Sequence, residues 1–335
     1  MRNIKRAALL PVLVLLCLTG TGPAWPQTEP DPVASAPQLQ NPRRIAGGPN
    51  GQVLVTDRRY GAIVAVDSTS LMPVWSAPLP QEGAPFGLAV TNRRVFVGNT
   101  STKNVEIYRL HGPGGPDTRL SFAYNLGNVP TGAIGPFKNP IGIAVDANEN
   151  LVFVLDGAAK RIEAYKPNGS FEYAFEPRDR DGALMSPVSL AVDKLRREIL
   201  VGDYGNPQPE PDCSFCAYTP AAAARILIYS YSGELLFEIR GDGSTHWSTR
   251  FARVQGMAAS ADGRIFAADP LGGRILVFDR YSGALLQKLG TQGPEEGQLM
   301  LPLDVWLDDE TGDLFISNNR GARRVEVLRG AGGPP

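Results

Sequence analysis

Residues 137–175 read FKNPIGIAVDANENLVFVLDGAAKRIEAYKPNGSFEYAF, and this stretch contains four short apolar runs. The runs are Ile141–Val145, Leu151–Leu155, Ile162–Tyr165 and Phe171–Phe175. Turn-forming pairs such as Asp156-Gly157 and Asn168-Gly169 separate them. Apolar and aromatic runs of this length between such turns predict strands joined by hairpins. The stretch therefore predicts a four-stranded antiparallel meander, which needs neighbours because it cannot cover both of its faces alone.

The same unit recurs six times along the chain. The first strands are expected to open at Pro42, Pro85, Pro140, Pro187, Val254 and Pro302. An Asp or Asn closes each second strand, at Asp57, Asn99, Asp156, Asp203, Asp269 and Asn318. In five of the units a third apolar run follows closely, as Ile162 follows Asp156. Four-stranded units that recur at this spacing predict an all-β fold, a six-bladed β-propeller of four-stranded antiparallel blades.

The two ends of the chain are expected to close the ring together. The sixth unit ends at Leu328, and the following RGAGGPP is too rich in Gly and Pro to form a fourth strand. Val33–Pro37 resembles Val74–Pro78, the fourth run of the first unit. We therefore expect the N-terminal arm to add the missing outer strand to the last blade and protect its edge.

The pattern of these units resembles the NHL-repeat family. The resemblance rests on Pro140-Ile-Gly-Ile-Ala-Val-Asp146, on the strand ending at Asp156, and on Arg161-Ile162 at the start of the next strand. It covers residues 41–329 and is weakest in the first unit, where Arg44 stands at a position that favours Gly. The family implies a propeller. Its members include protein-binding, RNA-binding and enzymatic proteins, so function must be argued from a site.

Residues 1–24 have the pattern of an export signal. Arg2, Lys5 and Arg6 precede an apolar run over residues 7–18, which is shorter than a membrane span. Small residues at Gly22 to Ala24 predict cleavage after Ala24. A retained membrane anchor and lipidation at Cys17 are the alternatives. The pattern predicts an exported protein, periplasmic or secreted, with no membrane span after cleavage.

The remaining segments and the charge follow from composition. We expect a Pro-rich arm over residues 25–40, the propeller over 41–329 and a disordered tail over 330–335. The formal charge of −1 becomes −4 once the three basic residues of 1–24 are removed. This mild acidity argues against nucleic acid as the partner. We expect a monomer that binds a protein or another extracellular or envelope ligand.

Several polar residues have a structural interpretation. An Asp or Asn at the same place in six blades is expected to cap the following turn. His111 and His246 are the only histidines, and neither has a partner at zinc-ligand spacing. Basic pairs such as Arg43-Arg44 are expected to lie on solvated turns, since acidic residues balance them along the chain.

The fourth unit carries a long insertion, Tyr204–Ala224. It separates Asp203 from the third strand, which is expected to begin at Arg225, and a loop of this length is usually functional or disordered. Cys213 and Cys216 predict a local disulfide in an exported protein, with a redox-active dithiol as the alternative. Tyr204, Phe215 and Tyr218 are candidate binding residues because aromatic side chains anchor interfaces.

These observations favour a non-catalytic binding or scaffold protein that uses the face of the second-to-third-strand loops and the 204–224 insertion. No catalytic residue is assigned, and this interpretation requires no cofactor. The alternative is a propeller enzyme of the lactonase or lyase kind, with a divalent cation at the mouth of the central channel. Its candidate residues are Gln255 and Asp304, near the openings of two inner strands.

Overall fold

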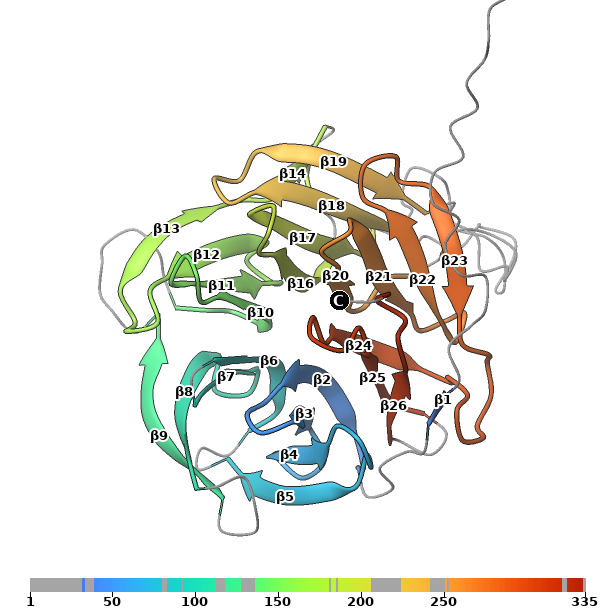
Figure 1. Ribbon diagram of the computed structural model, residues 1–335. Helices are drawn as coiled ribbons and strands as arrows, with labels where there is room; N and C mark the ends of the chain where they lie inside the picture. The colour runs from blue at the N-terminus through green and yellow to red at the C-terminus, as the bar shows by residue number, and fades with distance from the viewer. Residues whose placement is uncertain are drawn as a thin grey trace, which may run out of the picture.

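The computed structural model forms a ring of six β-sheets around a central axis (Figure 1). It describes residues 32–33, 39–79, 83–91, 93–112, 118–127, 136–180, 182–184, 186–205, 224–241, 251, 253–320 and 324–333. Each of the six sheets has four antiparallel strands, as the repeat predicts. In the described part of the chain, no helix offers a span of membrane length.

The blades follow the sequence in order, from the inner to the outer strand. The first blade is β2 (Pro42–Gly47), β3 (Gln52–Asp57), β4 (Ala62–Asp67) and β5 (Pro73–Pro78). The second is β6 (Pro85–Thr91), β7 (Arg94–Asn99), β8 (Asn104–His111) and β9 (Arg119–Leu126). The third is β10 (Pro140–Asp146), β11 (Leu151–Asp156), β12 (Arg161–Tyr165) and β13 (Phe171–Phe175).

The fourth blade is β16 (Pro187–Asp193), β17 (Glu198–Asp203), β18 (Arg225–Ser230) and β19 (Leu235–Arg240). A small hairpin, β14 (Arg178–Asp179) and β15 (Gly182–Ala183), precedes it. The fifth is β20 (Met257–Ala259), β21 (Arg264–Asp269), β22 (Arg274–Asp279) and β23 (Leu285–Leu289). The sixth is β24 (Pro302–Leu307), β25 (Leu314–Asn318), β26 (Arg324–Leu328) and the N-terminal β1 (Pro32–Val33).

The arm closes the ring as the sequence predicts. Strand β1 pairs antiparallel with β26, with Pro32 opposite Leu328 and Val33 opposite Val327. Farther along the chain, Leu39 lies in a cluster of buried residues that also includes Ile45 of the first blade and Phe315 of the sixth. The blade edge left by the last repeat is thus covered by the first part of the chain.

The inner strands line the axis and approach each other closely. In five blades the register shifts just after the opening Pro, which marks a β-bulge. The second residue after that Pro is Gly87 in the second blade and Gly142 in the third. A Cβ on Gly142 would lie 2.8 Å from the Leu190 Cβ of the next blade. The repeated Gly therefore lets neighbouring inner strands come together.

The first strand of the fifth blade is shorter than expected. The sequence predicts a start at Val254, whereas β20 begins at Met257. Residues 255 and 256 still bond to the second strand, because the Gln255 amide donates to the Ala268 carbonyl and the Ala268 amide donates to the Gly256 carbonyl. The strand thus begins in an irregular pairing.

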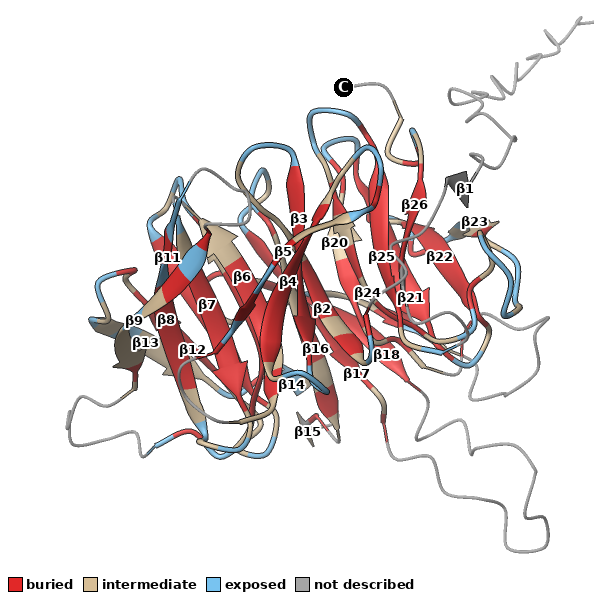
Figure 2. Cartoon of the chain, turned by 90° about the horizontal axis from the view of Figure 1, so that it is seen from below, coloured by how far each residue is buried: buried red, intermediate tan, exposed pale blue. Residues whose placement is uncertain are grey.

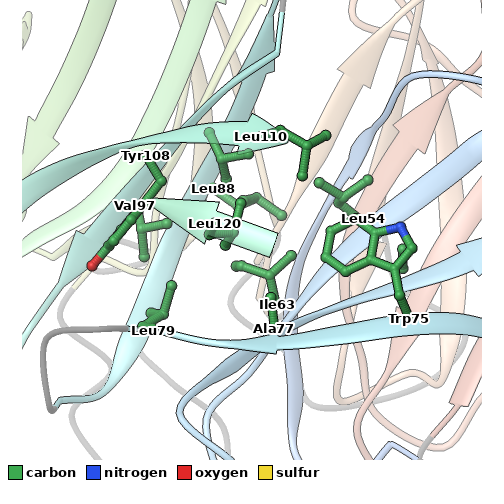
Figure 3. Close-up of a cluster of buried hydrophobic side chains, with 12 residues drawn as sticks. Leu54, Ile63, Trp75, Ala77, Leu79, Leu88, Val97, Tyr108, Leu110 and Leu120 are labelled. Atoms are coloured by element: carbon green, nitrogen blue, oxygen red, sulfur yellow. The ribbon is translucent and has the colours of Figure 1, made fainter. Parts of the chain in front are cut away.

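Apolar side chains between adjacent blades form the core. In Figure 3 the cluster between the first two blades joins Leu54, Ile63 and Trp75 to Leu88 and Tyr108. A fully buried aliphatic side chain of this kind contributes about 1.5–3 kcal/mol relative to an exposed one. The indole N–H of Trp75 donates to Gln52 at 2.9 Å, so its polar atom is also satisfied.

The strands run between two loop-bearing faces of the ring (Figure 2). We call one of them the Asx face: the second strands end there at Asp57, Asn99, Asp156, Asp203, Asp269 and Asn318. The inner strands begin on that face, since Pro42 pairs with Asp57 and Pro140 with Asp156. Hairpins between first and second strands and between third and fourth strands lie on the opposite face.

Part of the expected C-terminal tail is held in place. Ala331 is buried, and its carbonyl and that of Gly332 accept hydrogen bonds from Arg264. The Gly332 amide donates to the Gly312 carbonyl at 2.7 Å. The segment through residue 333 is therefore anchored to the opposite face, in contrast to the disordered tail expected from its Gly content.

Candidate functional site

The six Asp and Asn side chains of the Asx face accept hydrogen bonds from backbone amides. Four of them cap the turn that follows, as predicted: Asp57, Asn99, Asp156 and Asp269. Asp156 accepts from the Ala159 amide at 3.0 Å and thereby caps its own turn. It also accepts from the amides of Lys138 and Asn139 at 2.6 and 2.9 Å, which lead into the inner strand. Asp57 makes the same two sets of contacts in the first blade. Asp57 and Asp156 therefore each fix the start of an inner strand to the turn beside it.

Two of the four carboxylates that end second strands are also neutralised by an arginine of their own blade. Arg225 contacts Asp203 at 2.7 Å, and Arg274 contacts Asp269 at 3.1 Å. Burial raises the pKa of Asp269, while the Gly272 amide and Arg274 act in the opposite direction. These carboxylates are used within the fold and are not directed at a ligand.

Arg44 crosses the propeller axis. It stands in the first blade at the position that is Gly in three others, and only 5% of it is exposed. Its guanidinium donates to the Val188 carbonyl of the fourth blade at 2.7 Å and to the Gln255 carbonyl of the fifth at 3.2 Å. It also pairs with Asp304 of the sixth blade at 3.3 Å. The expectation that Arg43-Arg44 is a solvated pair is therefore wrong for Arg44, which links four blades.

Asp304 and Gln255, the two candidates from the inner strands, meet at this arginine. One Asp304 oxygen accepts from Arg44, and the other accepts from the Ile45 amide at 3.1 Å. Burial raises the pKa of Asp304, and Arg44 opposes that shift. Gln255 contributes its backbone carbonyl to the contact. The structure thus brings both residues to the axis and places a guanidinium between them.

The donor set at the axis does not suit a divalent cation. Such an ion needs several oxygen ligands, and the Asp304 carboxylate and Gln255 carbonyl already bind the Arg44 guanidinium. Across the described ranges, no three His, Cys, Asp or Glu side chains group closely enough to hold a metal. His111 lies on the outer part of the second blade, where its ring contacts the Ser121 hydroxyl at 2.6 Å.

Tyr204 lies at the Asx face, directly after the second strand of the fourth blade. The guanidinium carbon of Arg253 is 5.0 Å from the centre of its ring. Burial raises the pKa of Tyr204, while the positive charges of Arg253, Arg44 and Arg43 lower it. Tyr204 therefore belongs to a cationic cluster with residues of the first and fifth blades.

Arg43 and Arg253 are the residues that sequence reasoning missed. The Arg43 guanidinium lies 5.8 Å from the ring centre of Phe86. Burial lowers the pKa of Arg43, and the charges of Arg58 and Arg44 lower it further. The one available signal was the departure of Arg43-Arg44 from the Gly-containing pattern of the other blades.

The other candidates of the insertion, Cys213, Phe215, Cys216 and Tyr218, lie outside the described residues. Their disulfide and binding roles remain predictions. His246 also lies outside the described residues.

Comparison with solved structures supports the propeller fold. The chain is similar to a structural genomics protein of unknown function from Bacteroides thetaiotaomicron VPI-5482, with a TM-score of 0.60 and 16% identity over 87% of this chain and 70% of that one. It is also similar to the WD40 β-propeller domain of Doa1, with a TM-score of 0.54 and 14% identity over 85% of this chain and 78% of that one. No family model matches the chain. No curated protein matches it either.

Proposed function

We propose that this protein is an exported, non-catalytic binding protein of the NHL-repeat type, whose partner docks on the Asx face. The observation that carries this proposal is the asymmetry of that face. The connection from β17 to β18 runs from Asp203 to Arg225, whereas its counterpart in the third blade runs only from Asp156 to Arg161. The long connection leaves the ring at Tyr204, beside the cationic cluster. Propellers of many functions share such a loop-bearing face, so the role is inferred from this site and not from the fold.

The geometry of the axis favours binding over the metal-dependent enzyme alternative. One Asp304 oxygen and the Gln255 carbonyl are bonded to Arg44, and the other Asp304 oxygen accepts from the Ile45 amide. Backbone amides and arginines likewise occupy the Asp and Asn side chains of the Asx face. What remains for a partner is a surface of loops, cations and aromatic rings, which is typical of an interaction site.

The test replaces residues 206–222 with a short Gly-containing turn. We expect the ring to stay folded, because the described strands β17 and β18 are left intact. We expect the shortened protein to lose the partners that the full chain retrieves from an envelope extract. A control variant shortens the loop between His111 and Arg119 on the opposite face, and it should retrieve the same partners as the full chain. Equal retrieval by all three proteins would refute the proposed recognition element.

Export and the disulfide have separate tests. A processed protein should begin at Trp25, which N-terminal sequencing of purified protein reads directly. Non-reduced protein should yield a peptide in which Cys213 and Cys216 are joined, two hydrogens lighter than the reduced form. Retention of Met1, or two freely alkylated thiols, would contradict the respective proposal.

A further inference from the structure

Three arginines act on Tyr204 at the Asx face. The guanidinium carbon of Arg253 lies 5.0 Å from the centre of its ring, and the positive charges of Arg43 and Arg44 of the first blade also lower its pKa. Arg44 of β2 donates a hydrogen bond to the Val188 carbonyl of β16. These two inner strands lie on opposite sides of the axis (Figure 1). The cluster is therefore assembled from the first blade and from the fourth and fifth blades, which lie far from the first in the sequence.

Two of the three arginines have no counter-charge in the described part of the chain. Arg44 pairs with Asp304, but no described carboxylate forms an ion pair with Arg43 or Arg253. The Nε atom of Arg43 is buried without a hydrogen-bond partner among the described residues. An unbonded donor of a charged group, placed beside further cations, destabilises the folded protein.

Elsewhere in the ring, several arginines of similar burial are neutralised. Arg161 pairs with Glu163, and Arg225 pairs with Asp203. Arg280 donates to both oxygens of Glu198 at 2.6 and 2.5 Å. The positive charge at Tyr204 has no such partner among the described residues. Binding of an external anion would therefore be favourable at this place.

We propose that Arg43, Arg253 and Tyr204 form a binding site for a carboxylate group of an acidic peptide segment. The proposal rests on the proposed function, because it assigns the chemistry of the partner that docks on the Asx face. Guanidinium groups bind carboxylates through two parallel hydrogen bonds, and a tyrosine hydroxyl adds a third donor. Such a carboxylate would accept hydrogen bonds from the guanidinium groups and would relieve the repulsion among the cations.

The small extent of the cluster favours a short acidic segment over a nucleic acid. A phosphate backbone needs a stripe of unpaired cations, which release counterions along its length. Here two arginines without an ion pair lie close to Tyr204, other arginines such as Arg161 and Arg280 pair with acids of the protein, and the whole chain has a formal charge of −1. One or two carboxylates match this charge distribution.

The test titrates the full protein with a labelled tetraglutamate peptide whose ends are blocked, followed by fluorescence anisotropy at low salt. We expect binding that weakens when the salt is raised from about 50 to about 500 mM, since added ions screen the charges. Replacing both arginines, R43Q with R253Q, should weaken binding at least about tenfold, which corresponds to the loss of charge-assisted hydrogen bonds. Y204F should weaken it by about threefold, because a single hydroxyl donor is lost.

A matched control removes two positive charges elsewhere. Arg109 and Arg119 are exposed on the third and fourth strands of the second blade, and R109Q with R119Q should bind the peptide as the parent protein does. A blocked tetraglutamine peptide should not bind.

Thermal unfolding checks that the variants are folded. The double variant at the site should be as stable as the parent protein or more stable, because its cations are uncompensated. Should it fail to fold, the single R253Q variant carries the test.

Three results would overturn the inference. The first is that the parent protein does not bind tetraglutamate with a dissociation constant below about 1 mM, the weakest specific binding worth interpreting here. The second is that the site variant and the control variant bind the peptide equally. The third is that single-stranded oligouridine binds with the variant pattern expected for the peptide. The protein with residues 206–222 replaced should still bind the peptide. If the parent protein does not bind the peptide but still captures partners through the loop, this inference alone is refuted. If it binds the peptide but partner capture does not depend on the loop, the proposed function alone is refuted.

Discussion

The junction between the sixth and first blades differs from the junction between the third and fourth. In the latter, Gly142 allows close contact with Leu190, and a cluster of Phe153, Leu155 and Val201 fills the space. The closing junction adds many polar contacts. They include Arg44 with Asp304, the Ser317 hydroxyl with the Arg43 carbonyl at 2.8 Å, and the Asn319 amide with the Pro42 carbonyl at 2.8 Å.

The difference reflects how each junction is connected along the chain. The third and fourth blades are consecutive, so the chain itself keeps them together and apolar packing suffices. The sixth and first blades are joined only after most of the chain has been placed. Hydrogen bonds and ion pairs are directional, and they therefore favour one register of the two ends over a merely apolar contact.

The largest effect is expected from breaking the ion pair at the closing junction. Arg44→Met leaves the Asp304 carboxylate buried with the backbone amides of Ile45 and Val305 as its remaining donors. Loss of one partner of a buried pair costs about 3–5 kcal/mol of unfolding free energy. Urea unfolding followed by circular dichroism measures it. Adding Asp304→Asn should recover part of the loss, and a single variant within about 1 kcal/mol of the parent protein would contradict the role given to Arg44.

A smaller loss is expected at the consecutive junction. Gly142→Ala would place its Cβ 2.8 Å from the Leu190 Cβ, so the inner strands must separate. Overpacking of this kind costs about 1–3 kcal/mol. Ser189→Ala is the matched control. Ser189 holds the same position in the next blade, and its buried hydroxyl has no partner among the described residues, so the change should be neutral. Equal melting temperatures for both variants would argue against close packing at this position.

Removing the closing strand should have a more modest effect. A chain that begins at Leu39 lacks β1 but keeps Leu39 and the amides that Asp57 holds. Two residue pairs with β26 are lost, worth about 1–2 kcal/mol in hydrogen bonds. A chain that begins at Trp25 is the reference in thermal unfolding. The exposed edge should also increase self-association, detectable by light scattering. Identical melting temperatures and particle sizes for the two chains would contradict a role of β1 in closing the ring.

The smallest effect concerns pH at hairpins that serve neither junction. The Ser282 hydroxyl and amide hold the pKa of Asp279 below its usual range. A lowered pKa in the folded state means that the carboxylate stabilises the protein above the unfolded pKa of about 3.9. That contribution is lost as the pH falls through the folded pKa. The melting temperature of Asp279→Asn should therefore be slightly below that of the parent protein at pH 6, with the gap closing toward pH 2.5. A gap that is constant with pH would contradict this assignment.

Much of the fold could be predicted from sequence because each blade is a local unit. The Pro openings, the Asp or Asn at the end of each second strand and the echo between Val33–Pro37 and Val74–Pro78 all report short-range chemistry. The β1–β26 pairing follows from the same pattern. The anchoring of residues 330–333 could not be predicted in this way, because their partners Arg264 and Gly312 come from other parts of the ring.

The candidate site could be predicted only in part. The sequence predicts Asp304 and Gln255 near the openings of inner strands and Tyr204 in the long insertion, but it predicts a solvated turn for Arg44, which contacts Asp304 and Gln255 and whose charge acts on Tyr204. Arg44 and Asp304 are 260 residues apart in the chain. Their contact depends on the curvature of the whole ring, and no local spacing encodes that curvature.

The pairing of Pro32 with Leu328 has a consequence for synthesis of the protein. A ribosome makes residues 32–33 near the beginning and residues 324–328 near the end, so the sixth blade stays incomplete until almost the entire chain has emerged. Early blades can form as hairpins, but closure is a contact of very high sequence separation and therefore a slow one. The nascent chain consequently spends its synthesis as an open arc with unpaired edges, in the state where aggregation and chaperone binding compete with folding.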